Sequence, residues 1–316
     1  MIFNSNYYWL IGALVVIIVQ AFIVNHWSNA KYWTILNAIF LIATIISYSA
    51  FSFKNKVSKE RVQMLKSSTN ISQKVITEKD ISHLPAVVQK WLVNGGVMGK
   101  KPITNIRLTQ DLQLKMTPEQ NSWNNGIAEQ YITVQPPTFN WSIKTRMGVM
   151  GVVGRDKFEH GQGEMVIKLM SLVSVANAKQ SEKVDQATLQ RYLAEIVWYP
   201  TASLSPYIVW EQIDGNTAKA TMKVNDTKGA GAFYFDDHGN FLKFTALRYK
   251  DLKDKEPKLW TVSAIKTEER NGIRMPVELK ADWKLDNGDW TWLKLKIKAI
   301  NYNVTKTPTV GNMYAK

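Results

Sequence analysis

The chain opens with two long apolar runs and then changes to short segments in which apolar and polar residues alternate. The first run, YYWLIGALVVIIVQAFIV, spans 7–24, and the second, WTILNAIFLIATIISYSAFSF, spans 33–53; neither contains a charged residue. Each is long enough to cross roughly 30 Å of hydrocarbon as a helix. Because only residues 25–32 separate them, we expect 1–53 to form an antiparallel two-helix transmembrane hairpin.

The next stretch, 54–81, is rich in charge and predicts a helical or flexible connector that leads to a large domain over 82–316. Pro85 begins a short helical pattern, PAVVQKWLVNGG, with Val87, Val88, Trp91 and Leu92 on one side and Gly95 and Gly96 at its end. Proline at a helix start and glycine at its end are typical boundary signals.

From residue 103 onward the alternation has a period of two, which is typical of half-buried antiparallel strands. Runs such as IRLTQDLQLKM, AEQYITV and FNWSIKTR recur a dozen times with tight turns between them, including an Asp-Asp-His-Gly turn at 236–239. One helical segment, VDQATLQRYLAEIVWYP, interrupts them, with Asp185 as the expected N-cap and Pro200 after its end. The fold class is therefore α+β and mostly antiparallel β: a curved sheet or incomplete β-barrel with a covering helix, preceded by the transmembrane hairpin.

The charge of the chain indicates an anionic partner. It carries 40 Lys and Arg against 26 Asp and Glu, a formal charge of +14. For a membrane-tethered protein the nearest anionic surface is the lipid headgroup layer. The basic residues are scattered among acids rather than gathered in a block, so we expect no nucleic-acid partner. Basic residues at 54–66 outnumber Lys31 in the loop between the apolar runs, and this bias places the large domain on the cytoplasmic side of a cell membrane.

Arg191 and Glu195 are the first candidates for a binding site, because they lie four residues apart on one face of the predicted helix. Two interpretations remain. One is an ordinary i,i+4 ion pair; in the other, Arg191 holds an anionic headgroup, Glu195 orients it, and Trp198 and Tyr199 form the apolar wall.

Asp156 and His160 are weaker candidates, from the segment RDKFEHGQGE, and a solvated strand and turn is the alternative. In a strand they share a face while Arg155 and Glu159 share the other, so the four do not converge. The four histidines show no metal-ligand spacing, and with no cysteine we expect no metal site and no cofactor.

Tryptophans are frequent in the large domain, which predicts either ordinary core packing or a cavity lined by some of the rings. In WTWLKLKIKAI the strand period places Trp290 and Trp292 on one face and Leu293 and Leu295 on the opposite face.

The order HLPAVVQKWLVNGGVMGK, AEQYITVQPPTFNW, LQRYLAEIVWYPTA, FDDHGNF and FTALRYKD resembles a family of bacterial membrane-anchored proteins of unknown function, over residues 82–302. The segment RYLAEIVWYPTA carries the resemblance most specifically. By strand pattern the chain also resembles, more distantly, the open β-barrels that carry lipid or lipoprotein between membranes. Several such carriers work outside the cytoplasm, which opposes the sidedness that the charges indicate.

These observations lead to three hypotheses. The first is a membrane-tethered protein that binds a lipid or another anionic amphiphile. The second is an enzyme that acts on a membrane-associated anionic substrate, with Glu195, Asp156 or His160 as candidate groups. The third is a structural partner of another membrane protein, for which an exposed apolar patch would be the sign.

Overall fold

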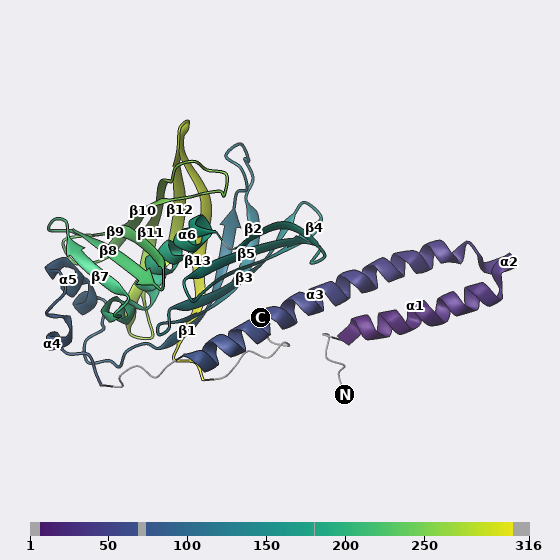
Figure 1. Cartoon of the computed structure of the whole chain (residues 1–316), viewed down its shortest axis with the longest axis horizontal. Coiled ribbons are helices and arrows are strands. Elements are labelled where there is room, and N and C mark those ends of the chain that lie inside the picture. Colours follow the sequence, from purple (N-terminus) through teal and green to yellow (C-terminus); the bar gives the residue numbers. More distant parts are fainter. Residues whose placement is uncertain (1–6, 69–73, 180, 306–316) are drawn as a thin grey trace.

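The computed structural model describes residues 7–68, 74–179 and 181–305. It consists of a long helical hairpin attached to a strand-rich body (Figure 1). The hairpin contains α1 (Tyr8–Asn25), the short α2 (Trp27–Ala30) and α3 (Trp33–Ser67). Residues 69–73 of the predicted connector and 306–316 of the predicted domain lie outside the described residues.

Helices α1 and α3 are both long and apolar enough to cross a membrane. Only 11% and 6% of the residues in their most apolar windows are buried, so most of this apolar surface is not covered by the rest of the described chain. Asn37 of α3 donates to Gln20 Oε1 at 2.9 Å and to the Val16 carbonyl at 3.1 Å. Gly12 permits close approach, since a Cβ there would lie 2.7 Å from Thr44 Oγ1. The predicted antiparallel hairpin is confirmed.

The first part of the predicted connector is helical and continues the second apolar run without a break to Ser67. Helix α3 then reaches the strand-rich body, where Phe53 and Val57 pack against Val153. The helix that begins in the apolar hairpin therefore ends on the surface of the sheet (Figure 1).

Thirteen antiparallel strands form one sheet, in the order β6-β5-β4-β3-β2-β1-β13-β12-β11-β10-β9-β8-β7. Strands that follow each other in the chain lie side by side in the sheet, with one exception: β6 and β7 are the two edge strands. The first and last strands, β1 and β13, also pair with each other. The sheet curls into a half-barrel, as the alternation of polar and apolar residues predicted. The strands are β1 Asn105–Leu114, β2 Asn124–Thr133, β3 Thr138–Met147, β4 Met150–Glu159, β5 Gln162–Leu169, β6 Val173–Lys179, β7 Ile208–Gln212, β8 Thr217–Val224, β9 Thr227–Phe235, β10 Phe241–Arg248, β11 Lys258–Arg270, β12 Ile273–Leu285 and β13 Gly288–Tyr302.

The link between the two edge strands crosses the concave face of the sheet. It consists of α6 (Glu182–Glu195) and two 3-10 turns, η2 (Ile196–Trp198) and η3 (Pro200–Leu204). Helix α6 begins one turn earlier than predicted, after Ser181, and Asp185 is therefore not its N-cap. The Asp185 carboxylate instead accepts a hydrogen bond from the Gly163 backbone N–H at 2.7 Å.

The core lies between α6 and the concave face and continues to α4 (Glu78–Ile81) and α5 (Ala86–Asn94) at one end of the half-barrel. The apolar side of α5 is buried as predicted, and Trp91 stacks at a centroid distance of 6.2 Å on Phe233. Along β13 a bulge changes the predicted faces. Trp290 pairs with Trp283 and Leu293 with Ala281, so Trp290 and Leu293 face the same side, because an extra residue between them reverses the alternation.

Candidate functional site

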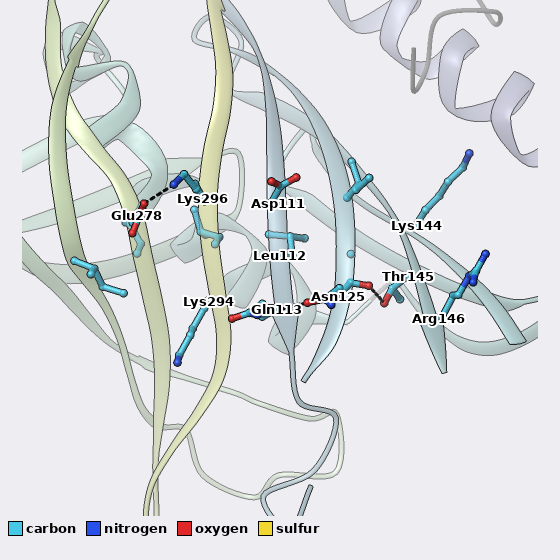
Figure 2. A pocket seen from close by; sticks show the side chains of 15 residues that line it. Asp111, Leu112, Gln113, Asn125, Lys144, Thr145, Arg146, Glu278, Lys294 and Lys296 are labelled. Carbon is cyan, nitrogen blue, oxygen red and sulfur yellow. Dashed lines mark hydrogen bonds and ion pairs between the residues drawn. The ribbon is translucent and has the colours of Figure 1, made fainter. Parts of the chain in front are cut away.

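One groove lies on the outer, convex side of the sheet, across β12, β13, β1, β2 and β3. Its volume is about 690 Å³. Its lining includes residues that lie opposite each other on neighbouring strands. Asp111 is opposite Lys296, and Ile127 is opposite Lys144. Figure 2 shows Lys144, Arg146 and Lys294 extending away from the strands. The groove is therefore a basic surface feature, and its lining includes none of the candidate site residues that the sequence indicated.

Arg191 and Glu195 lie on the concave side, where α6 faces the sheet. Arg191 Nε donates to Glu195 Oε1 at 2.8 Å, and Arg191 Nη1 donates to Asp156 Oδ2 of β4 at 2.7 Å. The guanidinium also lies 4.9 Å from the ring centroid of Phe139 and 4.8 Å from that of Trp141. The predicted ion pair exists, but Arg191 also contacts Asp156 of β4 and the rings of Phe139 and Trp141 of β3.

Two glutamines continue this polar cluster across the sheet. Gln130 of β2 donates from Nε2 to Glu195 Oε2 at 2.6 Å, and Gln110 of β1 accepts from Trp141 Nε1 at 2.9 Å. Gln130 is fully buried, and its Oε1 atom has no hydrogen-bond partner among the described residues. A buried acceptor of this kind is rare in a folded protein and points to an additional polar group in the site.

Arg248, the last residue of β10, is a second guanidinium on the same side of the sheet. Its Nε donates to the Ala187 carbonyl of α6 at 2.9 Å, and its Cζ lies 4.6 Å from the ring centroid of Trp260. Within the described part of the chain it forms no ion pair, and Trp260 Nε1 has no hydrogen-bond partner. Arg248 is thus a half-buried cation that has no carboxylate within ion-pair distance among the described residues, although Asp156 and Glu195 act on its charge at longer range.

The charges in this cluster influence one another strongly. Burial raises the pKa of the Asp156 carboxyl above its usual value, although Arg191 opposes that rise. Burial also disfavours charge on Arg191, but Glu195 and Asp156 outweigh it and raise the pKa of that guanidinium. Burial, together with repulsion from Arg191, lowers the pKa of Arg248 to about 10, although Asp156 and Glu195 partly oppose this shift. An additional anion beside Arg248 would relieve this unfavourable environment.

Apolar side chains that are only partly buried lie next to the cluster on the concave face. Trp141, Leu293 and Leu295 pack around the buried Leu112 and Ile143. These residues come from β1, β3 and β13, beyond the part of the sheet that α6 covers. The arrangement places a charged cluster beside an accessible apolar surface, which suits an amphiphile with an anionic head.

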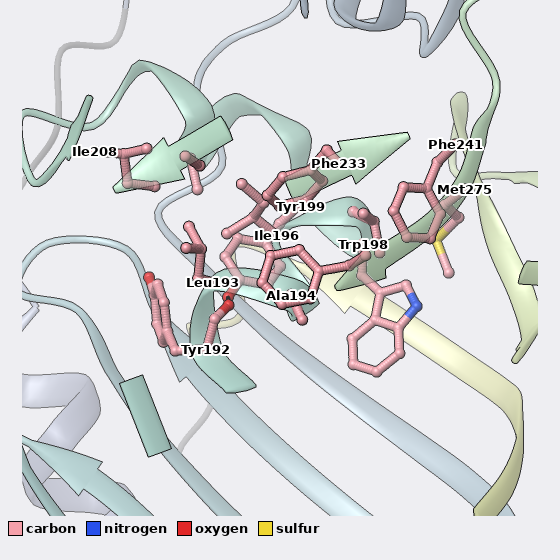
Figure 3. Packing of buried hydrophobic residues seen from close by; sticks show 14 of the residues in the cluster. Tyr192, Leu193, Ala194, Ile196, Trp198, Tyr199, Ile208, Phe233, Phe241 and Met275 are labelled. Atoms are coloured by element: carbon pink, nitrogen blue, oxygen red, sulfur yellow. Dashed lines mark hydrogen bonds between the residues drawn. The ribbon is translucent and has the colours of Figure 1, made fainter. Parts of the chain in front are cut away.

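Trp198 and Tyr199 are core residues. Trp198 Nε1 donates to the Pro276 carbonyl at 3.1 Å, and the fully buried Tyr199 donates from its hydroxyl to the Tyr192 carbonyl at 3.3 Å. Figure 3 shows both rings among aliphatic side chains and Met275. They lie three and four residues after Glu195, just beyond the end of α6, so their connection with the cluster is through the helix.

Asp156 and His160, the weaker candidates, are not brought together. Asp156 points to the concave side with Arg191, whereas His160 is exposed in the β4–β5 turn with a φ of 54°. Arg155 points to the convex side and donates to Glu164 at 2.8 Å, which confirms the prediction that neighbouring residues of this strand face apart. Among the described residues no three His, Cys, Asp or Glu side chains form a group that suits a metal ion.

Gln130 and Arg248 were not predicted as site residues. Arg248 ends the run FLKFTALR, in which Phe244 and Ala246 are buried, so its position in the same alternation as two core residues was a readable signal. For Gln130 the signal was similar, because Ala128 and Ile132 flank it two residues away on the same face.

The fold defines a thirteen-stranded half-barrel with an internal helix, carried by two apolar N-terminal helices. Residues 74–295 match the family of unknown function DUF6544, and the chain belongs to that family. No curated protein sequence matches the chain. Among solved structures, a LolA superfamily protein from Nitrosomonas europaea is similar with a TM-score of 0.41 and 8% identity, over 70% of this chain and 96% of that one.

Proposed function

We propose that this protein is anchored in a membrane by α1 and α3 and that its half-barrel binds an anionic amphiphile, of which a membrane lipid is the nearest source. The observation that carries the proposal is the interior cluster of Arg191 and Arg248. It combines a guanidinium that lacks an ion-pair partner among the described residues with a buried, unpaired Gln130 acceptor and an adjacent apolar surface.

The head of the ligand would lie beside Arg248, where a phosphate or carboxylate would form the close ion pair that Arg248 lacks among the described residues. A guanidinium favours such groups because its planar donors match their oxygens. The apolar part would lie along Trp141, Leu293 and Leu295. Arg191 stays paired with Asp156 and Glu195, so that the charges of these two carboxylates are compensated and do not repel the head.

Lipid retention by matched variants tests the proposal. Full-length protein is purified in detergent, its bound lipids are extracted, and they are quantified by mass spectrometry for wild type, Arg248→Gln and Lys243→Gln. Lys243 is an exposed residue of the same strand and serves as the control. Lipid held around α1 and α3 is common to all three proteins, so the difference between them reports on the interior site alone.

We expect an anionic lipid that wild type and Lys243→Gln retain and that Arg248→Gln retains about tenfold less, since a hydrogen bond to a charged group contributes on the order of 1.5 kcal/mol or more. Equal retention by all three proteins would refute the proposal.

The enzyme alternative rests on one observation, the raised pKa of Asp156. A protonated carboxyl in an interior site suits a general acid. Arg191 donates to it, however, and His160 is exposed in a turn away from the cluster, so the second titratable group that the sequence suggested is not beside it. Binding is therefore the function that the geometry supports better.

A further inference from the structure

Two hairpin ends of the sheet, β3–β4 and β5–β6, expose apolar side chains where turns usually carry polar ones. Val149, in the β3–β4 turn, is 97% exposed. Its neighbours in these two ends are also exposed: Met147, Met150, Met170, Leu172, Val173 and Val175. We call these seven residues the apolar tips. The two ends are adjacent, because Met170 donates its backbone N–H to the Gly151 carbonyl at 2.7 Å.

The apolar tips point toward the membrane-spanning part of α3. Near the middle of β3, Asn140 and Ser142 contact Glu60 and Arg61 of α3. One step closer to the tip, Lys144 is near enough to Lys54 for its pKa to respond to that charge. Moving along β3 toward its tip therefore means moving back along α3 toward its apolar run. Figure 1 shows β3, β4 and β5 extending in the direction of the hairpin of α1 and α3.

The two hairpins carry basic residues and no acidic ones on the approach to their tips. Residues 143–154 contain Lys144 and Arg146, and residues 166–178 contain Lys168, with no Asp or Glu in either segment. Apolar tips with basic flanks complement the interface of an anionic bilayer, where each basic residue near the surface contributes about 1 kcal/mol.

The residues of the β5–β6 turn do not match its backbone conformation. Met170 and Ser171 have φ angles of 50° and 59°, a region in which Asn, Asp or Gly is ordinarily found. A methionine there is unfavourable for the turn itself. Its exposed apolar side chain is better explained by contact with an apolar medium than by folding of the hairpin.

We propose that the apolar tips are immersed in the headgroup region of the bilayer that α1 and α3 span, so that one end of the half-barrel rests on the membrane surface. This inference depends on the membrane anchoring stated under the proposed function. It adds a second, peripheral contact with the same bilayer and gives the concave face a fixed position beside the lipid.

The absence of cysteine from the chain allows a direct test with single fluorescent labels. Full-length Val149→Cys and Leu172→Cys are labelled with the environment-sensitive fluorophore NBD and reconstituted in vesicles of phosphatidylcholine and phosphatidylglycerol, with or without lipids that carry a shallow doxyl quencher. Val209→Cys is the control, since Val209 is also an exposed valine, 62% accessible, on β7 at one edge of the sheet. Ile35→Cys on α3 reports whether the hairpin is inserted.

Immersion predicts blue-shifted emission and doxyl quenching for labels at 149 and 172, with neither at 209. Quenching at 149 and 172 no stronger than at 209 would overturn the inference, and so would a blue shift without doxyl quenching, which would indicate a protein contact. An unquenched label at 35 would remove the anchoring and the inference together. Immersed tips without Arg248-dependent lipid retention would instead leave this inference standing and refute only the binding function.

Discussion

Arg61 of α3 lies fully buried against Glu129 of β2, with Nη1 2.5 Å from the Glu129 carboxylate. The guanidinium also donates to the Glu129 carbonyl, to Ser142 Oγ and to Asn140 Oδ1 at 2.8–3.0 Å, and it stacks on Tyr131. All of these partners lie on the convex face, opposite the interior cluster. The helix that leaves the apolar hairpin is therefore fixed to the sheet by a buried charge.

Replacing Arg61 should loosen this attachment. We expect Arg61→Met to destabilise the full chain by about 3–5 kcal/mol, because it leaves the buried Glu129 carboxylate with only the partly exposed Arg107. Urea unfolding in detergent, followed by tryptophan fluorescence, measures the change. Lys59→Met is the control, since Lys59 is exposed on the same helix, and it should change the free energy of unfolding by less than about 0.5 kcal/mol. Equal stability of the two variants would contradict the buried attachment.

The coupling free energy between Arg191 and Glu195 shows whether they form an exposed i,i+4 ion pair or part of a larger network with the sheet. A double-mutant cycle with Arg191→Met and Glu195→Gln should give a coupling free energy of about 1–3 kcal/mol, because Asp156 and Gln130 connect the two residues to the sheet. An ordinary i,i+4 pair contributes only about 0.3–0.5 kcal/mol. The cycle is measured by chemical unfolding of the four proteins. A coupling in the lower range would show that the contacts with the sheet add nothing.

Close packing of α6 on β5 requires a glycine at position 163. A Cβ there would lie 2.8 Å from the Val184 carbonyl and in collision with Thr188. We expect Gly163→Ala to destabilise the protein by about 1–3 kcal/mol through overpacking. Gly151→Ala, in β4, is the matched control, because nothing lies within 4 Å of the corresponding Cβ. Thermal unfolding of both variants should show a lower midpoint for Gly163→Ala only.

Lys144 should make stability depend on pH in the alkaline range. Burial, with a smaller contribution from Lys54, lowers the pKa of Lys144 to about 8 in the folded protein, so the unfolded chain binds the extra proton between about pH 8 and the ordinary value of 10.5. The contribution of this group to stability therefore rises with pH across that window. Lys144→Met should be more stable than wild type below pH 8 and lose this advantage as pH increases. Unfolding measured at a series of pH values tests this; a constant difference would contradict it.

Much of the fold was predictable because its signals are local. The apolar runs, the alternation of the strands and the helix boundaries at Pro85 and Gly95 each depend on neighbouring residues. The order of the strands was not predictable in the same way, since the pairing of β1 with β13 joins segments far apart in the chain. The bulge that turns Trp290 and Leu293 to one face was not predicted. A bulge depends on how the strand pairs with its neighbour, and the order of residues within the strand itself does not mark it.

The candidate site was predicted in part. Helical spacing brought out Arg191 and Glu195, and the strand period correctly separated Asp156 from Arg155. Gln130, which donates to Glu195, and Arg248, which donates to the Ala187 carbonyl, come from strands on either side of the helix, so only the curl of the sheet brings them to the cluster. Arg61 was assigned to a connector because its segment is highly charged, and only the position of α3 on the sheet shows that its charge is buried.

The pairing of β1 with β13 at the centre of the sheet determines when the fold can be completed. Ile106 pairs with Tyr302, so the ribosome must have made nearly the whole chain before the two halves can join. Contacts between residues so distant in sequence form slowly. Each half meanwhile exposes an unpaired strand, which favours aggregation. Since α1 and α3 are synthesised before the strands, their insertion as proposed above would tether the growing chain while it waits, and tethering would limit encounters with other incomplete copies.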